Sequence, residues 1–281
     1  MDGNQSGGTL AGKTIVMSGG SRGIGLAIAL RAASDGANVV LLAKTAVPQE
    51  KLSGTVFTAA EGIERAGGAA VAVVGDVRND EDVADAVRQA VERFGGVDIV
   101  VNNASAIDLS GTERLAMKRY DLMQDINTRG TFLLSRTAIP HLRAAANPHI
   151  LTLSPPLNLA PHWLGDHLGY TLSKYGMSMC TLGLAHELAG VGIAANSLWP
   201  RTLIDTAAVR NLIGGAERSR TPAVVADAAH AILVRDARTC TGNLFVDDEV
   251  LAEEGVTDLS GYRCAGDGQE EPALDIFLDP V

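Results

Sequence analysis

Cysteines are few in this sequence, and no two of them form a Cys-x-x-Cys pair. The three, Cys180, Cys240 and Cys264, lie far apart in a chain of 281 residues. We therefore expect no bound metal and no disulfide framework, and thiols that stay free in a reducing cytoplasm. Long apolar runs are missing as well. None approaches the length of about 20 residues that a membrane helix needs. The first residues lack the basic-then-apolar pattern of a secretory signal, so we expect a cytoplasmic protein without a membrane span.

An excess of basic residues is also lacking. The chain carries 23 basic and 33 acidic side chains, and eleven acids against one base lie between residues 247 and 281. Residues 1–246 are thus formally neutral and offer no basic face, which argues against nucleic acid as a partner. We interpret residues 251–281 as an acidic extension that packs on the same domain and exposes its charges to solvent. The polar, glycine-rich residues 1–9 are expected to be disordered.

Internal repeats and linker-like stretches are absent, so we expect one domain over residues 10–250. Short apolar runs predict strands, and helical periodicity between them predicts helices. The strands are expected at 14–17, 38–43, 70–74, 97–101, 149–153, 193–198 and 242–247. The helices are expected from 24 to before Gly36 and at 58–66, 81–94, 115–142, 170–189 and 223–233, with a loop around 162–167. This alternation predicts an α/β fold with a doubly wound, mostly parallel sheet flanked by helices.

A glycine-rich turn at residues 18–25 joins the first predicted strand to the first predicted helix. Its glycines let the backbone approach a pyrophosphate, and the helix start offers free N–H groups. The spacing is G-x-x-x-G-x-G, so the signal depends on the strand and helix around it. The second predicted strand ends in Lys44 rather than in an acid, and the glycine turn contains Arg22. Both favour NADP(H), with NAD(H) as the alternative, although Lys44 could also be a solvated lysine.

Tyr170 and Lys174 lie four residues apart in a predicted helix, so their side chains share one face. A neighbouring ammonium lowers the pKa of a phenol, which can then exchange protons near neutral pH. An isolated pair of this kind is more often a surface tyrosine and a solvated lysine. The other motifs of the sequence, described below, favour a catalytic pair here. Asn127 lies in the middle of a predicted helix, where asparagine is unfavourable. It either packs its amide against backbone groups or has a function.

Five motifs occur in the order that is typical of classical short-chain dehydrogenases/reductases. They are Ser18-Gly19-x-x-x-Gly23-x-Gly25, Asp76-Val77, Asn102-Asn103-Ala104, Asn127 and Tyr170-x-x-x-Lys174. The sequence resembles this family over residues 10–247, which implies a Rossmann-type fold. A narrower similarity, to the hydroxysteroid-dehydrogenase-like protein two subgroup, lies in residues 154–159, 174–179, 198–202 and 277–279. A sterol-carrier domain can follow in that subgroup; we expect none here, and no lipid-carrier role.

The resemblance implies a role for each matching residue. Tyr170 is the acid or base at the substrate oxygen, and Lys174 holds the nicotinamide ribose and lowers the pKa of Tyr170. Asn127 holds a water of the proton relay, while Asp76 and Val77 contact the adenine. The family also implies a homodimer or homotetramer. The complete predicted cofactor site comprises Gly19, Ser21, Arg22, Gly23, Ile24, Gly25, Lys44, Asp76, Val77, Asn103, Ala104, Ser105, Tyr170, Lys174, Pro200 and Thr202.

Two positions depart from the family pattern. Members carry a Ser-Ser pair after the fifth strand, and the second serine polarises the substrate carbonyl. This chain has Ser154 and Pro155, and proline has neither a hydroxyl nor an N–H. We predict that Ser154 or Asn158, with Ser154 preferred as the catalytic group, lies within hydrogen-bond reach of the Tyr170 hydroxyl or of a shared water. The usual Pro-Gly after the sixth strand is Pro-Arg at residues 200–201, beside the expected nicotinamide.

The sequence thus predicts an NADP(H)-dependent oxidoreductase that interconverts a carbonyl and a secondary or primary alcohol. The loop with Trp163, Leu164 and Leu168 and the segment 203–212 are expected to form an apolar lid. Such a lid favours a lipid-, terpenoid- or steroid-like substrate, although both elements could equally be core or a subunit contact. The alternative, which Pro155 motivates, is a cofactor-binding sensor or scaffold with little turnover.

Overall fold

Seven parallel strands form one sheet in the computed structural model, which describes residues 8–48, 54–264 and 271–280. The strand order is β3-β2-β1-β4-β5-β6-β7, so the chain winds outwards in both directions from β1. The strands are β1 Thr14–Ser18, β2 Asn38–Ala43, β3 Ala69–Val74, β4 Ile99–Asn102, β5 His149–Thr152, β6 Ala194–Trp199 and β7 Leu244–Val246. The predicted doubly wound parallel sheet is confirmed. The expectation of disorder falls mainly on residues 1–7, which lie outside the described residues.

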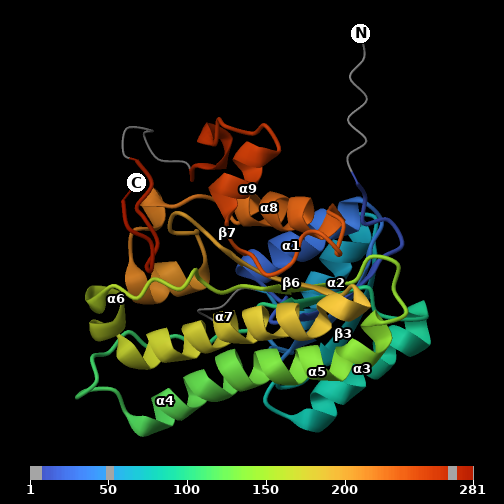
Figure 1. The fold of residues 1–281 in the computed structure, drawn as a ribbon, viewed down its shortest axis with the longest axis horizontal. Helices are drawn as coiled ribbons and strands as arrows, with labels where there is room; N and C mark the ends of the chain where they lie inside the picture. Colours follow the sequence, from blue (N-terminus) through green and yellow to red (C-terminus); the bar gives the residue numbers. More distant parts are fainter. Residues whose placement is uncertain (1–7, 49–53, 265–270, 281) are drawn as a thin grey trace.

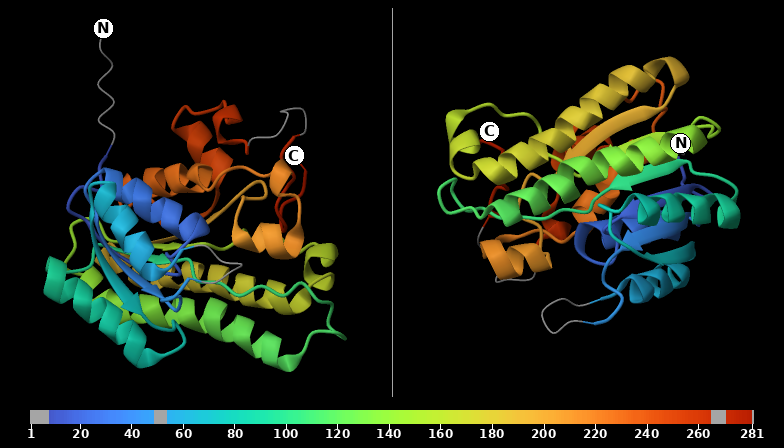
Figure 2. Two further views of the ribbon diagram at one scale, coloured as in Figure 1. Left: turned by 180° about the vertical axis from the view of Figure 1, so that it is seen from behind. Right: turned by 90° about the horizontal axis from the view of Figure 1, so that it is seen from below.

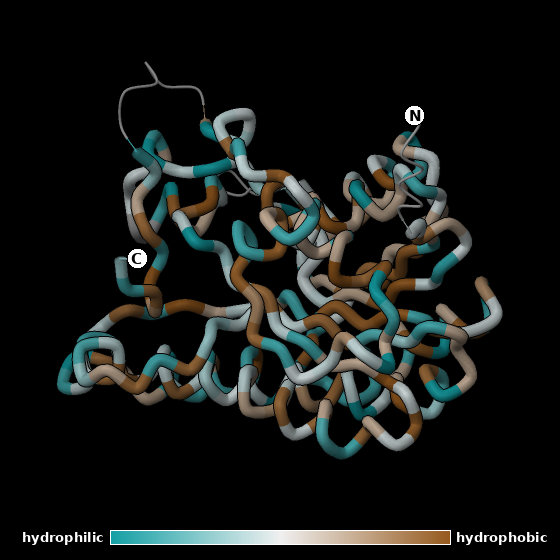
Figure 3. Tube along the Cα trace, turned by 45° about the horizontal axis from the view of Figure 1, so that its top comes forward, coloured by the Kyte–Doolittle hydropathy of each residue, from teal (hydrophilic) through white to brown (hydrophobic). Residues whose placement is uncertain are grey.

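Helices cover both faces of the sheet (Figures 1 and 2). One face carries α1 Gly23–Ser34, α2 Val56–Arg65 and α8 Ala223–Val234, and the other carries α3 Asp80–Phe94, α5 Gly130–Leu142 and α7 Leu168–Leu188. Strand side chains alternate between the two resulting cores: Ile15 and Met17 enter one, and Val16 enters the other. Because both faces are buried, the strands appear in the sequence as continuous apolar runs. Figure 3 shows hydrophobic stretches through the middle of the molecule and hydrophilic ones along outer turns.

The predicted helix 115–142 is one continuous rod with a defect in its middle. It consists of α4 Met117–Met123, a π-helical turn η1 Gln124–Arg129, and α5. Widened turns of this kind occur frequently at functional sites. Asn127 lies on this turn and is fully buried. No helix within the described ranges is both long enough and apolar enough to cross a membrane.

Two expectations about the second half of the chain are wrong. The loop expected around residues 162–167 contains a short helix, α6 Pro161–Gly165, whose leading proline lacks only an N–H that would be unpaired anyway. The acidic end is not simply a solvated surface either. Asp247, the first residue of α9 (Asp247–Glu253), is fully buried and accepts the N–H of Arg201. Phe277 is fully buried as well, and Figure 1 shows the C-terminal segment beside α6 and the start of α7.

Candidate active site

Two cavities meet at the carboxyl ends of the strands, where parallel α/β sheets bind their ligands. The larger cavity has a volume of about 670 Å³ and the smaller one about 180 Å³. They adjoin each other, because five residues line both: Ile24, Asn103, Ser105, Thr206 and Ala208. The last two belong to the segment after residue 203, which lies over the site as the sequence predicts.

The glycine turn after β1 forms one wall of the larger cavity. Gly19 has φ +74°, and a Cβ there would lie 2.8 Å from the Cα of Ala104. A Cβ on Gly25 would lie 2.4 Å from Nδ2 of Asn103, which donates to the Gly19 carbonyl at 2.9 Å. Bare backbone is therefore required where the turn meets the end of β4. The first turn of α1 presents its N–H groups there, so this wall fits a dinucleotide pyrophosphate.

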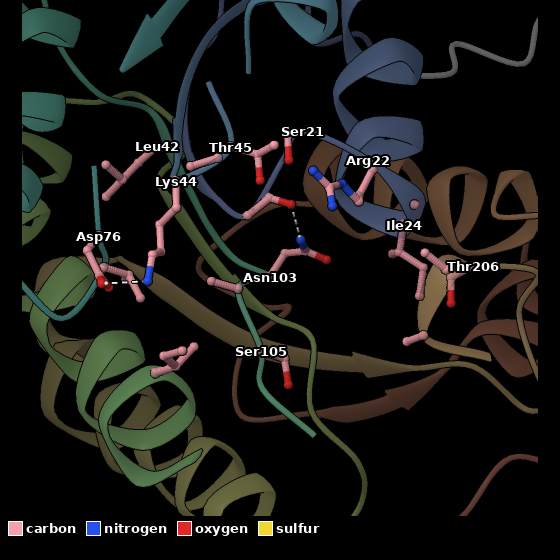
Figure 4. A pocket seen from close by; sticks show the side chains of 18 of the residues that line it. Ser21, Arg22, Ile24, Leu42, Lys44, Thr45, Asp76, Asn103, Ser105 and Thr206 are labelled. Carbon is pink, nitrogen blue, oxygen red and sulfur yellow. Dashed lines mark hydrogen bonds and ion pairs between the residues drawn. The ribbon is translucent and has the colours of Figure 1, made fainter. Parts of the chain in front are cut away.

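Charged side chains line the larger cavity on two sides, with Lys44 and Asp76 on one and Arg22 of the glycine turn on the other (Figure 4). Lys44 Nζ lies 3.1 Å from Oδ2 of Asp76, whose carboxylate also receives two hydrogen bonds through Arg78 Nε and one through its Nη2. The Arg78 hydrogen bonds hold the pKa of Asp76 well below its usual range, and Lys44 lowers it further. Arg22 donates from Nη2 to the Gly54 carbonyl at 3.1 Å, while its buried Nε has no partner among the described residues.

The structure gathers most of the predicted cofactor residues around the larger cavity. Those that line it are Gly19, Ser21, Arg22, Gly23, Ile24, Lys44, Asp76, Val77, Asn103, Ala104 and Ser105. Gly25 lies behind this wall on α1. Tyr170, Lys174 and Pro200 line the smaller cavity. Thr202 is buried outside both cavities, as are Asn127 and Ser154, which were predicted to be catalytic.

Tyr170 stands in the wall of the smaller cavity and is 4 % exposed. Burial raises the pKa of Tyr170 above its usual value, and the charge of Asp275 raises it further. A hydrogen bond with the Ser105 side chain acts in the opposite direction. The pKa of Tyr170 therefore shifts upward, opposite to the lowering expected from Lys174, and desolvation is the largest cause.

Lys174 follows one turn later on α7 and is 2 % exposed. Its Nζ donates to the Leu153 carbonyl at 2.5 Å, contacts Sδ of Met177 at 3.3 Å, and lies 4.9 Å from the ring centroid of Trp199. Burial lowers the pKa of Lys174 to about 7, although the charge of Asp275 favours the ammonium. The side chain can thus take up or release a proton near neutral pH.

Asn127 connects the π-helical turn to the helix that carries Tyr170. Its Nδ2 donates to the Ala106 carbonyl and to Oγ of Ser173, both at 2.9 Å, and its Oδ1 accepts the Ala106 N–H at 2.7 Å. The amide therefore packs against backbone and fixes the chain just after Ser105. A packing role and a functional role of Asn127 are compatible. Its bonds to Ala106 also hold the preceding residue Ser105, the hydrogen-bond partner of Tyr170, in place.

Neither candidate for the missing serine bonds to Tyr170. Ser154 is fully buried, and its Oγ has no hydrogen-bond partner in the described part of the chain. Asn158 donates to Asp279 at 2.7 Å, and its Oδ1 accepts the Ala160 N–H at 3.0 Å. The direct form of the predicted contact is therefore wrong, since these bonds engage Asn158 elsewhere and no hydrogen bond joins Ser154 to the phenol.

Sequence reasoning missed the contribution of the C-terminal segment. Asp275 lines the smaller cavity, and the Phe277 ring lies against Tyr170 with 6.0 Å between ring centroids. Phe277 has φ +73°, a conformation that few residues other than glycine adopt, and aromatic rings surround it. The one sequence signal for this contribution was the similarity of residues 277–279 to the subgroup. That similarity does not indicate what these residues do.

The family model described as short chain dehydrogenase matches residues 13–214, and the chain belongs to this family. Its members are oxidoreductases, and the fold and the site agree with that class. Among curated relatives, the chain is 53 % identical to hydroxysteroid dehydrogenase-like protein 2 of Danio rerio and 48 % identical to that of Homo sapiens. These matches cover 98 % and 97 % of this chain, but only 66 % and 65 % of the lengths of the two relatives.

Solved structures give the same result. A crystal structure from Xanthomonas campestris is 54 % identical with a TM-score of 0.93, and the match covers 97 % of this chain and all of that one. A short chain dehydrogenase of Mycobacterium thermoresistibile is also 54 % identical, with a TM-score of 0.91 and 96 % of both chains covered. A metagenomic short-chain oxidoreductase in complex with NADP is 26 % identical, with a TM-score of 0.68 over 84 % of this chain and 97 % of that one. A nicotinamide cofactor therefore suits this site.

Proposed function

We propose that the protein is an NADP(H)-dependent oxidoreductase that interconverts a carbonyl and an alcohol on an apolar substrate, with Tyr170 as the acid–base group. The observation that carries this proposal is that the two cavities adjoin each other and share five lining residues. One of them has a wall of bare backbone suited to a pyrophosphate, and the other contains Tyr170 and Lys174. A substrate in the smaller cavity lies next to a nicotinamide that enters from the larger one.

Each catalytic side chain has a separate task in the reduction direction. The bound cofactor supplies the hydride. The Tyr170 hydroxyl donates its proton to the substrate oxygen, and the Ser105 hydrogen bond favours the phenolate that remains. Lys174, whose pKa is lowered to about 7, returns a proton toward Tyr170 once its ammonium moves from the Leu153 carbonyl. The apolar walls exclude water, which would otherwise compete for these protons.

A preference for NADP(H) follows from the charges in the larger cavity. The Lys44 side chain is 59 % exposed, so its ion pair with Asp76 is of the weak surface kind. Arg78 keeps the Asp76 carboxylate satisfied when Lys44 leaves it. Lys44 is therefore free to bind a 2′-phosphate, and Arg22 offers a second cation on the same cavity.

An apolar substrate suits the walls of the smaller cavity. Apart from a few polar groups, these walls consist of hydrophobic side chains: Ile24, Ile107, Leu153, Trp199, Ile204, Val209 and Ile276. A sugar would leave its hydroxyls without partners there, whereas a hydrocarbon body loses nothing on leaving water. We therefore keep a lipid-, terpenoid- or steroid-like substrate as the proposal.

We further propose that the protein pairs with a second copy of itself. Phe132 of α5 and Leu172 and Met179 of α7 are large hydrophobic side chains that are 55 %, 46 % and 59 % exposed. They lie on the two neighbouring helices that form the outer layer opposite α8 (Figure 2). Replacing Phe132 with aspartate is expected to reduce the molar mass measured by light scattering, and an unchanged mass contradicts this interface.

The rival function, a cofactor-binding protein with little turnover, is favoured by one observation. Tyr170 receives no hydrogen bond from Ser154, and Pro155 provides no hydroxyl. The test is NADPH oxidation with a panel of aldehydes and ketones, combined with calorimetric titration of NADPH. Turnover of any carbonyl supports the enzyme. Tight NADPH binding without turnover across the panel supports the rival.

A further inference from the structure

The C-terminal segment is fixed at the edge of the smaller cavity by backbone bonds. Thr202 and Leu274 form an antiparallel bridge. The Leu203 N–H donates to the Ala273 carbonyl at 2.9 Å, and the Asp275 N–H donates to the Arg201 carbonyl at 3.0 Å. These bonds join residues 273–275 to the stretch that directly follows β6. The position of Asp275 is thus set by the stretch that leaves the sheet after β6.

Anchors on the far side of Asp275 complete this attachment. The Trp199 indole N–H donates to the Ile276 carbonyl at 3.0 Å. Asp279 accepts from the Trp163 indole at 3.1 Å and from Asn158 at 2.7 Å. Asp275 therefore lies between two attached stretches and forms part of the cavity wall.

The carboxyl of Asp275 has one oxygen available to a ligand. Its Oδ1 accepts the Ile276 N–H at 2.8 Å. Its Oδ2 has no hydrogen-bond donor among the described residues, and Asp275 lines the same cavity as Tyr170 and Lys174. The cavity has a volume of about 180 Å³ and is lined by Tyr170, Lys174 and Asp275. A substrate oxygen that reaches the Tyr170 hydroxyl therefore enters a cavity that Asp275 also lines, and the charge of Asp275 acts on Tyr170.

The charges around Asp275 allow it to hold a proton. Burial raises the pKa of Asp275 to about 7, and the neighbouring charge of Asp247 raises it as well, while Lys174 on α7 acts in the opposite direction. Asp247, at the start of α9, has a raised pKa of about 6 for the same reason, burial. A carboxyl group is then protonated for part of the time at neutral pH and can donate a hydrogen bond.

We propose that Asp275 is a further catalytic residue, whose carboxyl donates a hydrogen bond to the substrate oxygen in the role that Pro155 leaves unfilled. This inference rests on the proposed function. In the reduction direction the carbonyl carbon gains the hydride and the oxygen gains the proton of Tyr170. The carboxyl of Asp275 keeps its own proton and stabilises the negative charge that develops on the oxygen.

Kinetics of two substitutions test this role. Asp275→Ala removes the donor and is expected to lower kcat for NADPH-dependent reduction of decanal or cyclohexanone by about 10²–10³-fold. Asp275→Asn keeps an N–H donor and is expected to remain within about tenfold of the wild type. The control is Asp258→Asn, which removes an exposed acid of the same C-terminal region and should change nothing. Calorimetry with NADPH should give wild-type affinity for all three variants.

A readout without turnover separates this inference from the proposed function. Carbonyl ¹³C NMR of aspartate-labelled protein, with the Asp275 signal identified by its loss in Asp275→Asn, gives the protonation midpoint directly. A midpoint near 7 supports the donor, even if no carbonyl is reduced and the proposed function fails. A midpoint below 5 overturns the donor, because the group is then a carboxylate at neutral pH. Wild-type kcat in Asp275→Ala overturns it as well.

Discussion

The two cavities of the site are built in different ways. The larger one is lined mainly by the turns that directly follow β1, β2, β3 and β4, so its residues come in short local groups. The smaller one combines Ser105, Tyr170, Trp199 and Asp275, which lie up to 170 residues apart in the sequence. The larger cavity therefore depends on backbone shape near the glycines. The smaller one depends on long-range packing of buried side chains.

Aspartates in the two cavities show the consequence for electrostatics. Asp76 is held by Arg78 and Lys44, and these bonds place its pKa well below the usual range. Burial acts on Asp275 instead and raises its pKa to about 7. An aspartate is thus a fixed anion in the larger cavity, at Asp76, and a group that can exchange a proton in the smaller cavity, at Asp275. Pairing dominates at Asp76 in the larger cavity, and desolvation dominates at Asp275 in the smaller one.

The largest expected effect is the loss of turnover in Tyr170→Phe. The substitution removes only the hydroxyl of the smaller cavity, so catalysis should fall by about 10²–10⁴-fold, the usual contribution of general acid–base catalysis. NADPH affinity in the larger cavity should stay within about twofold. Steady-state kinetics and calorimetry measure the two quantities. Near-normal activity means that Tyr170 is not the acid–base group.

Phe277→Ala tests whether the C-terminal segment belongs to the folded core. Loss of a fully buried phenylalanine costs about 3–5 kcal/mol, because its ring contacts disappear and a cavity remains. We expect a lower Tm and lower turnover, with NADPH binding retained. Phe57→Ala is the matched control, since Phe57 of α2 is 48 % exposed. Equal Tm losses in both variants contradict the role of the segment.

Lys44→Ala sharpens the assignment of the larger cavity. A charge-assisted hydrogen bond to phosphate contributes roughly 1.5–3 kcal/mol, so NADPH affinity should fall about tenfold or more. NADH affinity should stay constant, because NADH has no 2′-phosphate. Lys118→Ala, on the exposed surface of α4, serves as the control. Wild-type NADPH affinity in Lys44→Ala, or tighter binding of NADH than NADPH by the wild type, refutes the preference.

The smallest expected effect is a pH-dependent change in stability in Asp275→Asn. The folded pKa of Asp275 is raised to about 7, so its favourable contribution is complete below the unfolded value of about 4 and is lost as pH rises through 7. The variant does not titrate at this position. The Tm of the variant minus the Tm of the wild type should therefore increase from pH 5 to pH 8. The increase is a few degrees if the free energy of unfolding of the wild type changes by on the order of 1 kcal/mol through this group. A constant difference contradicts the raised pKa.

The sequence predicts the larger cavity better than the smaller one, for a physical reason. The turn around Gly19 and the strand end at Lys44 are local patterns, and a parallel sheet brings such ends to one edge whatever the remaining packing. Lys44 alone had an unforeseen partner, Asp76, because side-chain pairing across strands is not a local property. The π-helical turn at Asn127 was missed for the same reason, since the bonds that support it reach Ala106 and Ser173.

The smaller cavity was predicted less completely, through Tyr170, Lys174, Pro200 and residues that it shares with the larger cavity. Tyr170 and Lys174 have a recognisable spacing, but burial reverses the expected direction of the Tyr170 pKa. Asp275 could not be placed, because the bridge between Thr202 and Leu274 joins segments about 70 residues apart. The net charge of the C-terminal part suggested a solvated surface, and charge alone does not show which acid is buried.

Transfer of deuterium from cofactor to substrate tests the central claim most directly. NADPH that carries deuterium at both C4 positions is incubated with the protein and a carbonyl that it reduces, and the alcohol is analysed by mass spectrometry. The account predicts an alcohol with one deuterium on the former carbonyl carbon, formed by the wild type and at least about 10²-fold more slowly by Tyr170→Phe. An unlabelled alcohol, or no alcohol from any carbonyl despite tight NADPH binding, would contradict it.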